Sequence, residues 1–199
     1  MKKTISILMM LLSFSLASAE DKKVDSKKVE PKMLKAAVLG ANDGIITTFA
    51  VVAGVVGAGL PVSTILILGV ANMIADGISM ALGDYLGEQS TRQMAGTTNQ
   101  PVSNFLHSTS FITFIAFVLA GSLPLLPYVV QLIGIQLQGE NQFTLSILST
   151  GIALFIVGSM RTIITKHGWL RSGIEMFAVG AFAAAIAYLL GAFIEKLVS

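Results

Sequence analysis

The chain has 199 residues, of which 54% are hydrophobic and only 12% are charged. This balance excludes most soluble enzymes, in which about a quarter of the residues are charged, and ordinary disordered proteins, which are poor in apolar residues. The absence of cysteine rules out disulfides, thiolate metal sites and cysteine nucleophiles. The net charge is +2, but eight of the thirteen Lys and Arg residues lie in the first 35 residues. The composition predicts a small polytopic membrane protein of a single domain.

Residues 1–19 have the three parts of a secretory signal peptide, namely two lysines, an apolar stretch and a small-x-small ending at residues 17–19. The apolar stretch of about 14 residues is too short to span a membrane comfortably. Residues 20–35 hold six lysines and four acids. We expect this segment to be a solvated tether, which also suits contact with anionic headgroups.

Five apolar segments follow, and each reaches the ~20 residues that a membrane-spanning helix needs. They cover approximately residues 36–60, 62–86, 105–128, 143–164 and 169–198. A Gly-Leu-Pro turn at residues 59–61 predicts that the first two segments form an antiparallel hairpin. Gly121, Pro124 and Pro127 interrupt the third segment near its end. The sequence therefore predicts an all-α, polytopic membrane protein with five transmembrane helices over residues 36–199.

The basic residues predict the orientation. Six lysines precede the first segment, Arg92 lies in the second connection, and Arg161, Lys166 and Arg171 surround the fourth. The positive-inside rule places the N-terminus in the cytoplasm and the C-terminus outside. A cleaved leader would instead leave residue 20 outside. We base the orientation on the charges of the loops. The leader is then either retained or precedes the true start of the protein.

Acidic residues inside apolar segments are costly, so they usually face a partner, a polar cavity or an ion path. Asp43 lies 17 residues before the turn near residue 60, and Met80 lies 20 residues after it. At about 1.5 Å per residue the two differ in depth by only about 4 Å. Asp76, Met80 and Asp84 share one helical stripe at i, i+4 and i+8, and Asn42 adds an amide oxygen beside Asp43.

These side chains predict the chemistry of a metal site. Oxygen ligands suit divalent cations such as Mn²⁺ and Fe²⁺, and a thioether favours transition metals over Mg²⁺ and Ca²⁺. Carboxylates also accept protons, so a metal and a proton can compete for the same groups. No histidine lies in the interior of a span, so a zinc-type imidazole site is not expected. The candidate metal ligands are Asp43, Met80, Asn42, Asp76 and Asp84.

Each candidate also has a simpler interpretation. Met80 on its own is typical core filling, and Asp84 and Glu88 fit interfacial residues that mark the end of a span. Glu175 fits an i,i+4 ion pair with Arg171 better than a transport role. Glu88 and Glu175 therefore remain secondary site candidates.

Small residues spaced four apart, at Gly40 and Gly44 and at Gly83 and Gly87, favour close approach of helices. The five short helices of one protomer are too few to enclose an ion path, so we expect a homodimer with a site near its axis.

Two motifs resemble the vacuolar iron transporter family. Residues 39–45 (Leu-Gly-Ala-Asn-Asp-Gly-Ile), followed by residues 47–49, are similar to the signature of its first helix. Residues 75–81 (Ala-Asp-Gly-Ile-Ser-Met-Ala), followed by residues 83–85, are similar to the signature of its second helix. The third and fifth segments are also similar, so the resemblance extends from about residue 34 to the C-terminus.

The resemblance implies a five-helix protomer, a homodimer, and export of Fe²⁺ or Mn²⁺ from the cytosol in exchange for protons. It implies a transported metal with no permanently bound cofactor, and no nucleic-acid partner. The matching pathway residues are Asp43 and Met80, with Asn42, Asp76 and Asp84 in support.

The chain departs from the family in two places. Many members carry a Glu-rich cytoplasmic insert after the second helix, but here residues 86–104 contain a single acid, Glu88. The usual Gly-Glu-Tyr is replaced by Gly-Asp-Tyr at residues 83–85. The style of the leader favours a bacterial inner membrane, with a vacuolar membrane as the alternative.

Two rival functions remain. A non-transporting membrane scaffold would use the acids only for helix pairing. An intramembrane enzyme is not expected, because the spans contain no Ser/His or His/Glu set, and His107 and His167 lie near span ends.

Overall fold

The computed structural model describes residues 31–94, 109–132, 139–165 and 168–199, and every element in this part of the chain is helical. The predicted leader and most of the tether lie outside these residues. The elements are α2 (Pro31–Gly57), α3 (Val62–Met94), α4 (Thr109–Gly121), η2 (Leu123–Leu125), α5 (Leu126–Leu132), α6 (Gly139–Met160), α7 (Thr162–Thr165) and α8 (Trp169–Val198). Five stretches of these helices are long and apolar enough to cross a membrane, which confirms the predicted spans.

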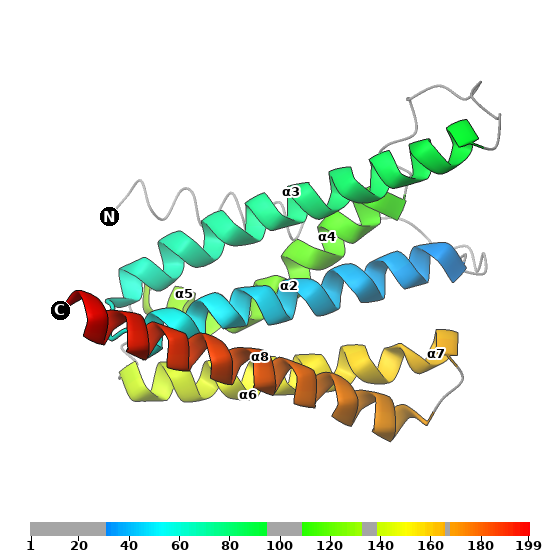
Figure 1. Cartoon of the computed structure of the whole chain (residues 1–199). Helices are drawn as coiled ribbons and strands as arrows, with labels where there is room; N and C mark the ends of the chain where they lie inside the picture. The colour runs from blue at the N-terminus through cyan, green and yellow to red at the C-terminus, as the bar shows by residue number, and fades with distance from the viewer. Residues whose placement is uncertain (1–30, 95–108, 133–138, 166–167) are drawn as a thin grey trace.

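The predicted turn between the first two spans is confirmed and has a specific backbone geometry. Gly59 has a φ of +63°, which suits glycine because it has no Cβ. The Gly59 N–H donates to the Val56 carbonyl at 3.0 Å, and the Leu60 N–H donates to the Val55 carbonyl at 3.1 Å. These two bonds form a Schellman motif, which ends α2. We call this end of the bundle, where α2 and α3 meet, the hairpin end (Figure 1).

The third span is broken as predicted. It runs as α4, a short 3₁₀ turn and α5, because Pro124 and Pro127 have no N–H to continue the helical ladder. Helix α6 supplies hydrogen bonds to the break. The Ser146 hydroxyl donates to the Pro124 carbonyl at 2.7 Å, and the Ser149 hydroxyl donates to the Leu123 carbonyl at 3.4 Å.

Glycines bring α2 against two other helices. A Cβ added at Gly40 or Gly44 would collide with backbone carbonyls of α4, and one added at Gly57 would collide with the Tyr188 carbonyl of α8. By contrast, a Cβ at Gly83 or Gly87 would meet nothing within 4 Å in the described part of the chain. The predicted close approach therefore involves the glycine pair of α2 and not the pair of α3.

Two apolar clusters form the core. The larger one, near the hairpin end, contains Phe49, Val52, Ala53, Val55, Ile65, Leu125, Tyr128 and Ala184. The second contains Ile45, Ala153, Leu154 and Met176. Helix α2 contributes to both clusters, so it is the central element of the bundle.

Two helices extend beyond the apolar segments. Helix α2 begins at Pro31, inside the expected tether, and α3 continues to Met94, eight residues past the expected end of its span. Local bonds support the last turns of α3, where the Ser90 and Thr91 hydroxyls donate to carbonyls four residues earlier. The end of the bundle at which α2 begins, α3 ends and α4 begins is called the cavity end. Figure 1 shows α2 and α3 spreading apart toward it.

Candidate functional site

A polar stripe follows one side of α3. Asp76, Met80 and Asp84 lie on this stripe as predicted, because α3 is continuous through all three. Asn72 and Glu88 continue the same four-residue spacing over 16 residues, or about 24 Å, but over that length the row turns about 160° around the helix, so these two residues lie on nearly opposite sides. The Asn72 amide donates to the Asp76 carboxylate at 2.7 Å. Asn72 is not among the residues predicted for the site, although its four-residue spacing from Asp76 is visible in the sequence.

The structure brings together the two acids inside the apolar spans. Asp43 of α2 and Asp76 of α3 are both half-buried, and their carboxylates lie close enough to interact electrostatically. Like charges repel strongly in a medium of low dielectric constant, and a cation placed between them relieves that repulsion. The pair therefore has the character of a cation site.

Asn42 lies beside Asp43 in sequence but on another side of α2, because adjacent helical residues are about 100° apart. Its side-chain oxygen, Oδ1, is buried and has no hydrogen-bond partner among the described residues. The structure therefore places an acceptor oxygen in the same turn as Asp43, directed away from the Asp43 face.

A cavity of about 720 Å³ lies at the cavity end between α2, α3 and α4. Its lining residues are Lys32, Lys35, Ala36, Leu39, Met80, Gly83, Asp84, Gly87, Glu88, Thr91, Thr109 and Thr113. Leu39 and Met80 are the deepest lining residues of α2 and α3. Asp43 comes four residues after Leu39, and Asp76 comes four residues before Met80, which places the carboxylate pair about 6 Å further along each helix. The cavity therefore leads from the cavity end toward the pair.

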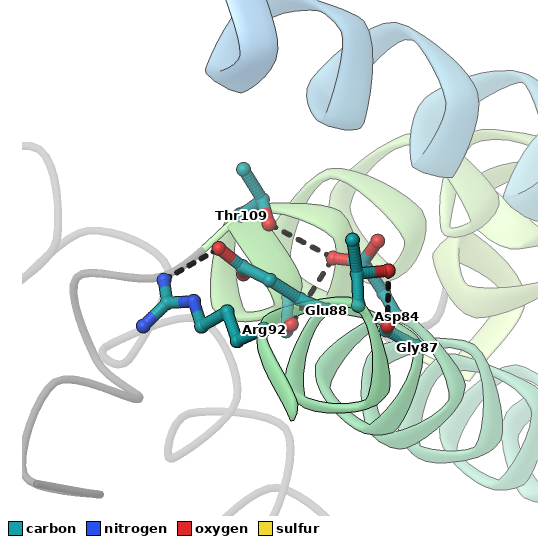
Figure 2. A network of polar contacts seen from close by, with 7 residues as sticks. Asp84, Gly87, Glu88, Arg92 and Thr109 are labelled. Atoms are coloured by element: carbon teal, nitrogen blue, oxygen red, sulfur yellow. Dashed lines mark hydrogen bonds and ion pairs between the residues drawn. The ribbon is translucent and has the colours of Figure 1, made fainter. Parts of the chain in front are cut away.

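Asp84 and Glu88 are held in place on the α3 wall of this cavity. The Thr109 and Ser110 hydroxyls of α4 both donate to Oδ2 of Asp84 at 3.0 Å. The Arg92 guanidinium pairs with the Glu88 carboxylate at 2.6 Å. Figure 2 shows Asp84 directed toward Thr109, with Glu88 and Arg92 side by side on the last turns of α3.

Glu175 lies apart from these residues. Its carboxylate accepts a bond from the Arg171 guanidinium at 3.1 Å, and both side chains are exposed on α8. The predicted i,i+4 pair is therefore present, and Glu175 is not among the residues that line the cavity.

The described residues contain no group of three or more His, Cys, Asp or Glu side chains that could hold a metal ion. Any metal held by the Asp43–Asp76 pair would thus need further ligands, and the thioether of Met80 lies one turn further along α3. Such a mixed set suits a passing transition-metal ion better than a closed structural site.

Comparison with known proteins identifies the family. A profile of the VIT family matches residues 34–104 and 99–192. The chain belongs to the VIT family.

Several VIT-family relatives are similar along most of the chain. It is 26% identical to "Vacuolar iron transporter 1" of Arabidopsis thaliana in an alignment of 216 residues, which covers 79% of the chain and 84% of the relative. It is 24% identical to "Vacuolar iron transporter homolog 3" of the same plant, over 89% of the chain and 90% of the relative.

Other similarities are higher but shorter. The chain is 39% identical over 80 residues to "Vacuolar iron transporter" of Toxoplasma gondii, which is 40% of the chain and 26% of that protein. A further relative of that name, from Plasmodium berghei, is 40% identical over 65 residues, or 24% of its length. The chain thus spans about a quarter of each of these two proteins.

Proposed function

We propose that this VIT-family chain transports a divalent transition metal, Fe²⁺ or Mn²⁺, out of the cytosol in exchange for protons. The observation that carries the proposal is the pairing of Asp43 with Asp76 inside two membrane-length helices, one turn beyond a cavity lined by Met80 and Asp84. An ionisable pair in such a position is typical of an ion path. The relatives are named vacuolar iron transporters or their homologues, which supports iron as a substrate.

The residues have different roles in this proposal. Asp43 is the main ligand and the proton acceptor, so that a proton arriving from outside releases the metal. The thioether of Met80 disfavours Mg²⁺, which prefers oxygen ligands. Asp76, aligned by Asn72, and Asp84 pass the cation between the cavity and Asp43, with Asn42 in support.

We propose that two protomers form the working unit. Asp43, Asp76 and Met80 are only half-buried in one protomer, and an ionisable group facing lipid is costly. A second copy packed on this side would enclose the path. The N-terminus would lie in the cytoplasm, so the cavity would open to the cytosol. A bacterial inner membrane suits the leader, and a vacuolar membrane is the alternative.

Transport by purified protein in liposomes tests the proposal. With an imposed pH gradient, we expect Mn²⁺ and Fe²⁺ uptake that is lost in Asp43→Asn, whose side chain has the same shape but no charge. The matched control is Glu175→Gln, which removes a charge outside the cavity and should keep wild-type uptake. Met80→Leu should keep Mn²⁺ uptake but reduce discrimination against Mg²⁺.

Unchanged transport in Asp43→Asn would remove the central role given to that carboxylate. A membrane scaffold without transport activity would show neither uptake nor a metal-dependent change in thermal stability.

A further inference from the structure

The cavity has two walls of opposite charge. Among the residues that the structure describes, the α2 wall consists of Lys32, Lys35, Ala36 and Leu39, with two positive charges and no acid. The α3 wall carries Asp84 and Glu88. Neither lysine forms an ion pair within the part of the chain that the structure describes. The charge of the cavity lining therefore changes from positive on α2 to negative on α3.

This distribution does not suit a cavity that collects bare cations. Two ammonium groups repel a divalent cation, and sites that concentrate cations are normally lined by one sign of charge. The acids are also engaged already, Asp84 by two hydroxyls and Glu88 by Arg92. Within the described part of the cavity lining, the charged donors without partners are the two lysine ammonium groups, each with three N–H bonds for an oxygen-rich anion.

The volume gives a second, independent indication. Six water molecules around a metal ion occupy roughly 180 Å³ in the liquid. The cavity of about 720 Å³ is several times larger and lies in the range typical of small-molecule sites. It has room for a metal together with an organic or phosphate anion.

We propose that the cavity binds the divalent metal as a complex with a small polycarboxylate or phosphate anion. The anion would lie on Lys32 and Lys35, and the metal would face Asp84 and Met80. The anion would stay in the cavity while the metal continues past Leu39 and Met80. This inference rests on the proposed transport function and names the form in which the substrate arrives. It also accounts for metal capture by a chain that has one acid in residues 86–104.

Calorimetry on the full chain in a neutral detergent tests this proposal, with Mn²⁺ alone, citrate alone and the Mn²⁺–citrate complex as probes. We expect the complex to bind at least about tenfold more tightly than either component, because each charge-assisted bond contributes over a kcal/mol. The double variant Lys32→Gln/Lys35→Gln should lose that gain while binding Mn²⁺ alone no more weakly. Lys196→Gln, a change of the same kind near the end of α8, is the matched control.

Opposite results would overturn the proposal. If the lysines only repel cations, the double variant will bind both Mn²⁺ and Mn²⁺–citrate more tightly than the wild type. If the anion is a lipid headgroup, citrate will add nothing in detergent. In that case the lysine substitutions will instead reduce the phosphatidylglycerol retained in native mass spectra. In either case Asp43-dependent uptake in liposomes would be unaffected, so the proposed function is tested separately.

Discussion

The two ends of the bundle are built differently. At the hairpin end, α2 touches α8 through glycines, and the larger apolar cluster fills the space between α2, α3 and the broken third span. At the cavity end, α3 separates from α2, and its glycines Gly83 and Gly87 have open space beside them. Glycines of α2 thus permit close helix contact along the bundle, including the contact of Gly40 with α4 beside the cavity, whereas Gly83 and Gly87 of α3 leave open space.

This difference between the two ends indicates where the helix packing accommodates polar and charged side chains. The polar groups in the closely packed hairpin end are uncharged, such as the Ser146 hydroxyl, which bonds to a backbone carbonyl, and the Gln142 amide, which bonds to Gln131. The charged side chains of α3 lie where the helices separate and where α4 offers hydroxyl donors. Four predictions, three of them with a matched control substitution, can break or sharpen this comparison.

The largest effect should come from filling a glycine contact at the hairpin end. In Gly191→Leu the new side chain would collide with the Gly54 carbonyl of α2, since even a Cβ does not fit there. We expect a loss of about 3 kcal/mol in the free energy of unfolding, measured by titration with a denaturing detergent. In the matched change Gly83→Leu, the Cβ has nothing within 4 Å among the described residues and helix propensity improves, so we expect the stability to be unchanged or higher. Equal destabilisation by both changes would show that the two ends pack alike.

A smaller loss is expected at the break in the third span. Ser146→Ala removes the donor to the Pro124 carbonyl, and an unpaired buried carbonyl costs about 1–3 kcal/mol. Tyr128→Phe is the control, because the Tyr128 hydroxyl is buried without a partner among the described residues. Its removal should leave the unfolding midpoint unchanged or raise it. A Tyr128→Phe protein that is less stable than Ser146→Ala would contradict this assignment.

The turn at the hairpin end should show an effect of about 1 kcal/mol. Gly59 has a positive φ, so Gly59→Ala adds left-handed strain of roughly that size. Gly87→Ala, in a regular exposed turn of α3, should instead be stabilising by helix propensity. The same unfolding titration compares the two, and a neutral Gly59→Ala would mean that the turn relaxes easily.

The smallest effect belongs to the exposed ion pair of α8. Arg171→Gln breaks the contact with Glu175, but both side chains are largely in solvent. Exposed pairs contribute less than about 1 kcal/mol, and this pair lies outside the cavity. Stability should fall by less than that amount, and metal uptake in liposomes should stay at the wild-type rate. A loss of uptake would make Glu175 part of the path after all.

Much of the fold could be predicted because hydropathy and the positions of glycine and proline are local signals. The five spans, the turn at residues 59–61 and the break at Pro124 and Pro127 all follow from the sequence. The start of α2 and the end of α3 did not follow from the sequence, because polar residues can continue a helix and hydropathy does not detect that continuation. The residues that each glycine contacts could not be predicted either, because they depend on how helices that are distant in sequence cross.

The candidate site was predictable along each helix but not between helices. The stripe through Asp76 and Met80 and the Arg171–Glu175 pair follow from helical spacing. The bonds from α4 to Asp84 depend on residues 25 and 26 positions away. The position of Lys35 in the cavity depends on α2 starting earlier than its apolar part indicates.

The length of α3 has a consequence for hydration. A helix crosses the ~30 Å hydrocarbon layer in about 20 residues, so α3, which has 33, leaves that layer near Leu82 when its first residue lies at the opposite boundary. Asp84 and Glu88 then stand among headgroups and water, where an ion keeps its hydration shell. On the proposed path, an ion would exchange this shell for protein ligands over the two turns between Asp84 and Asp76, where the thioether of Met80 is available.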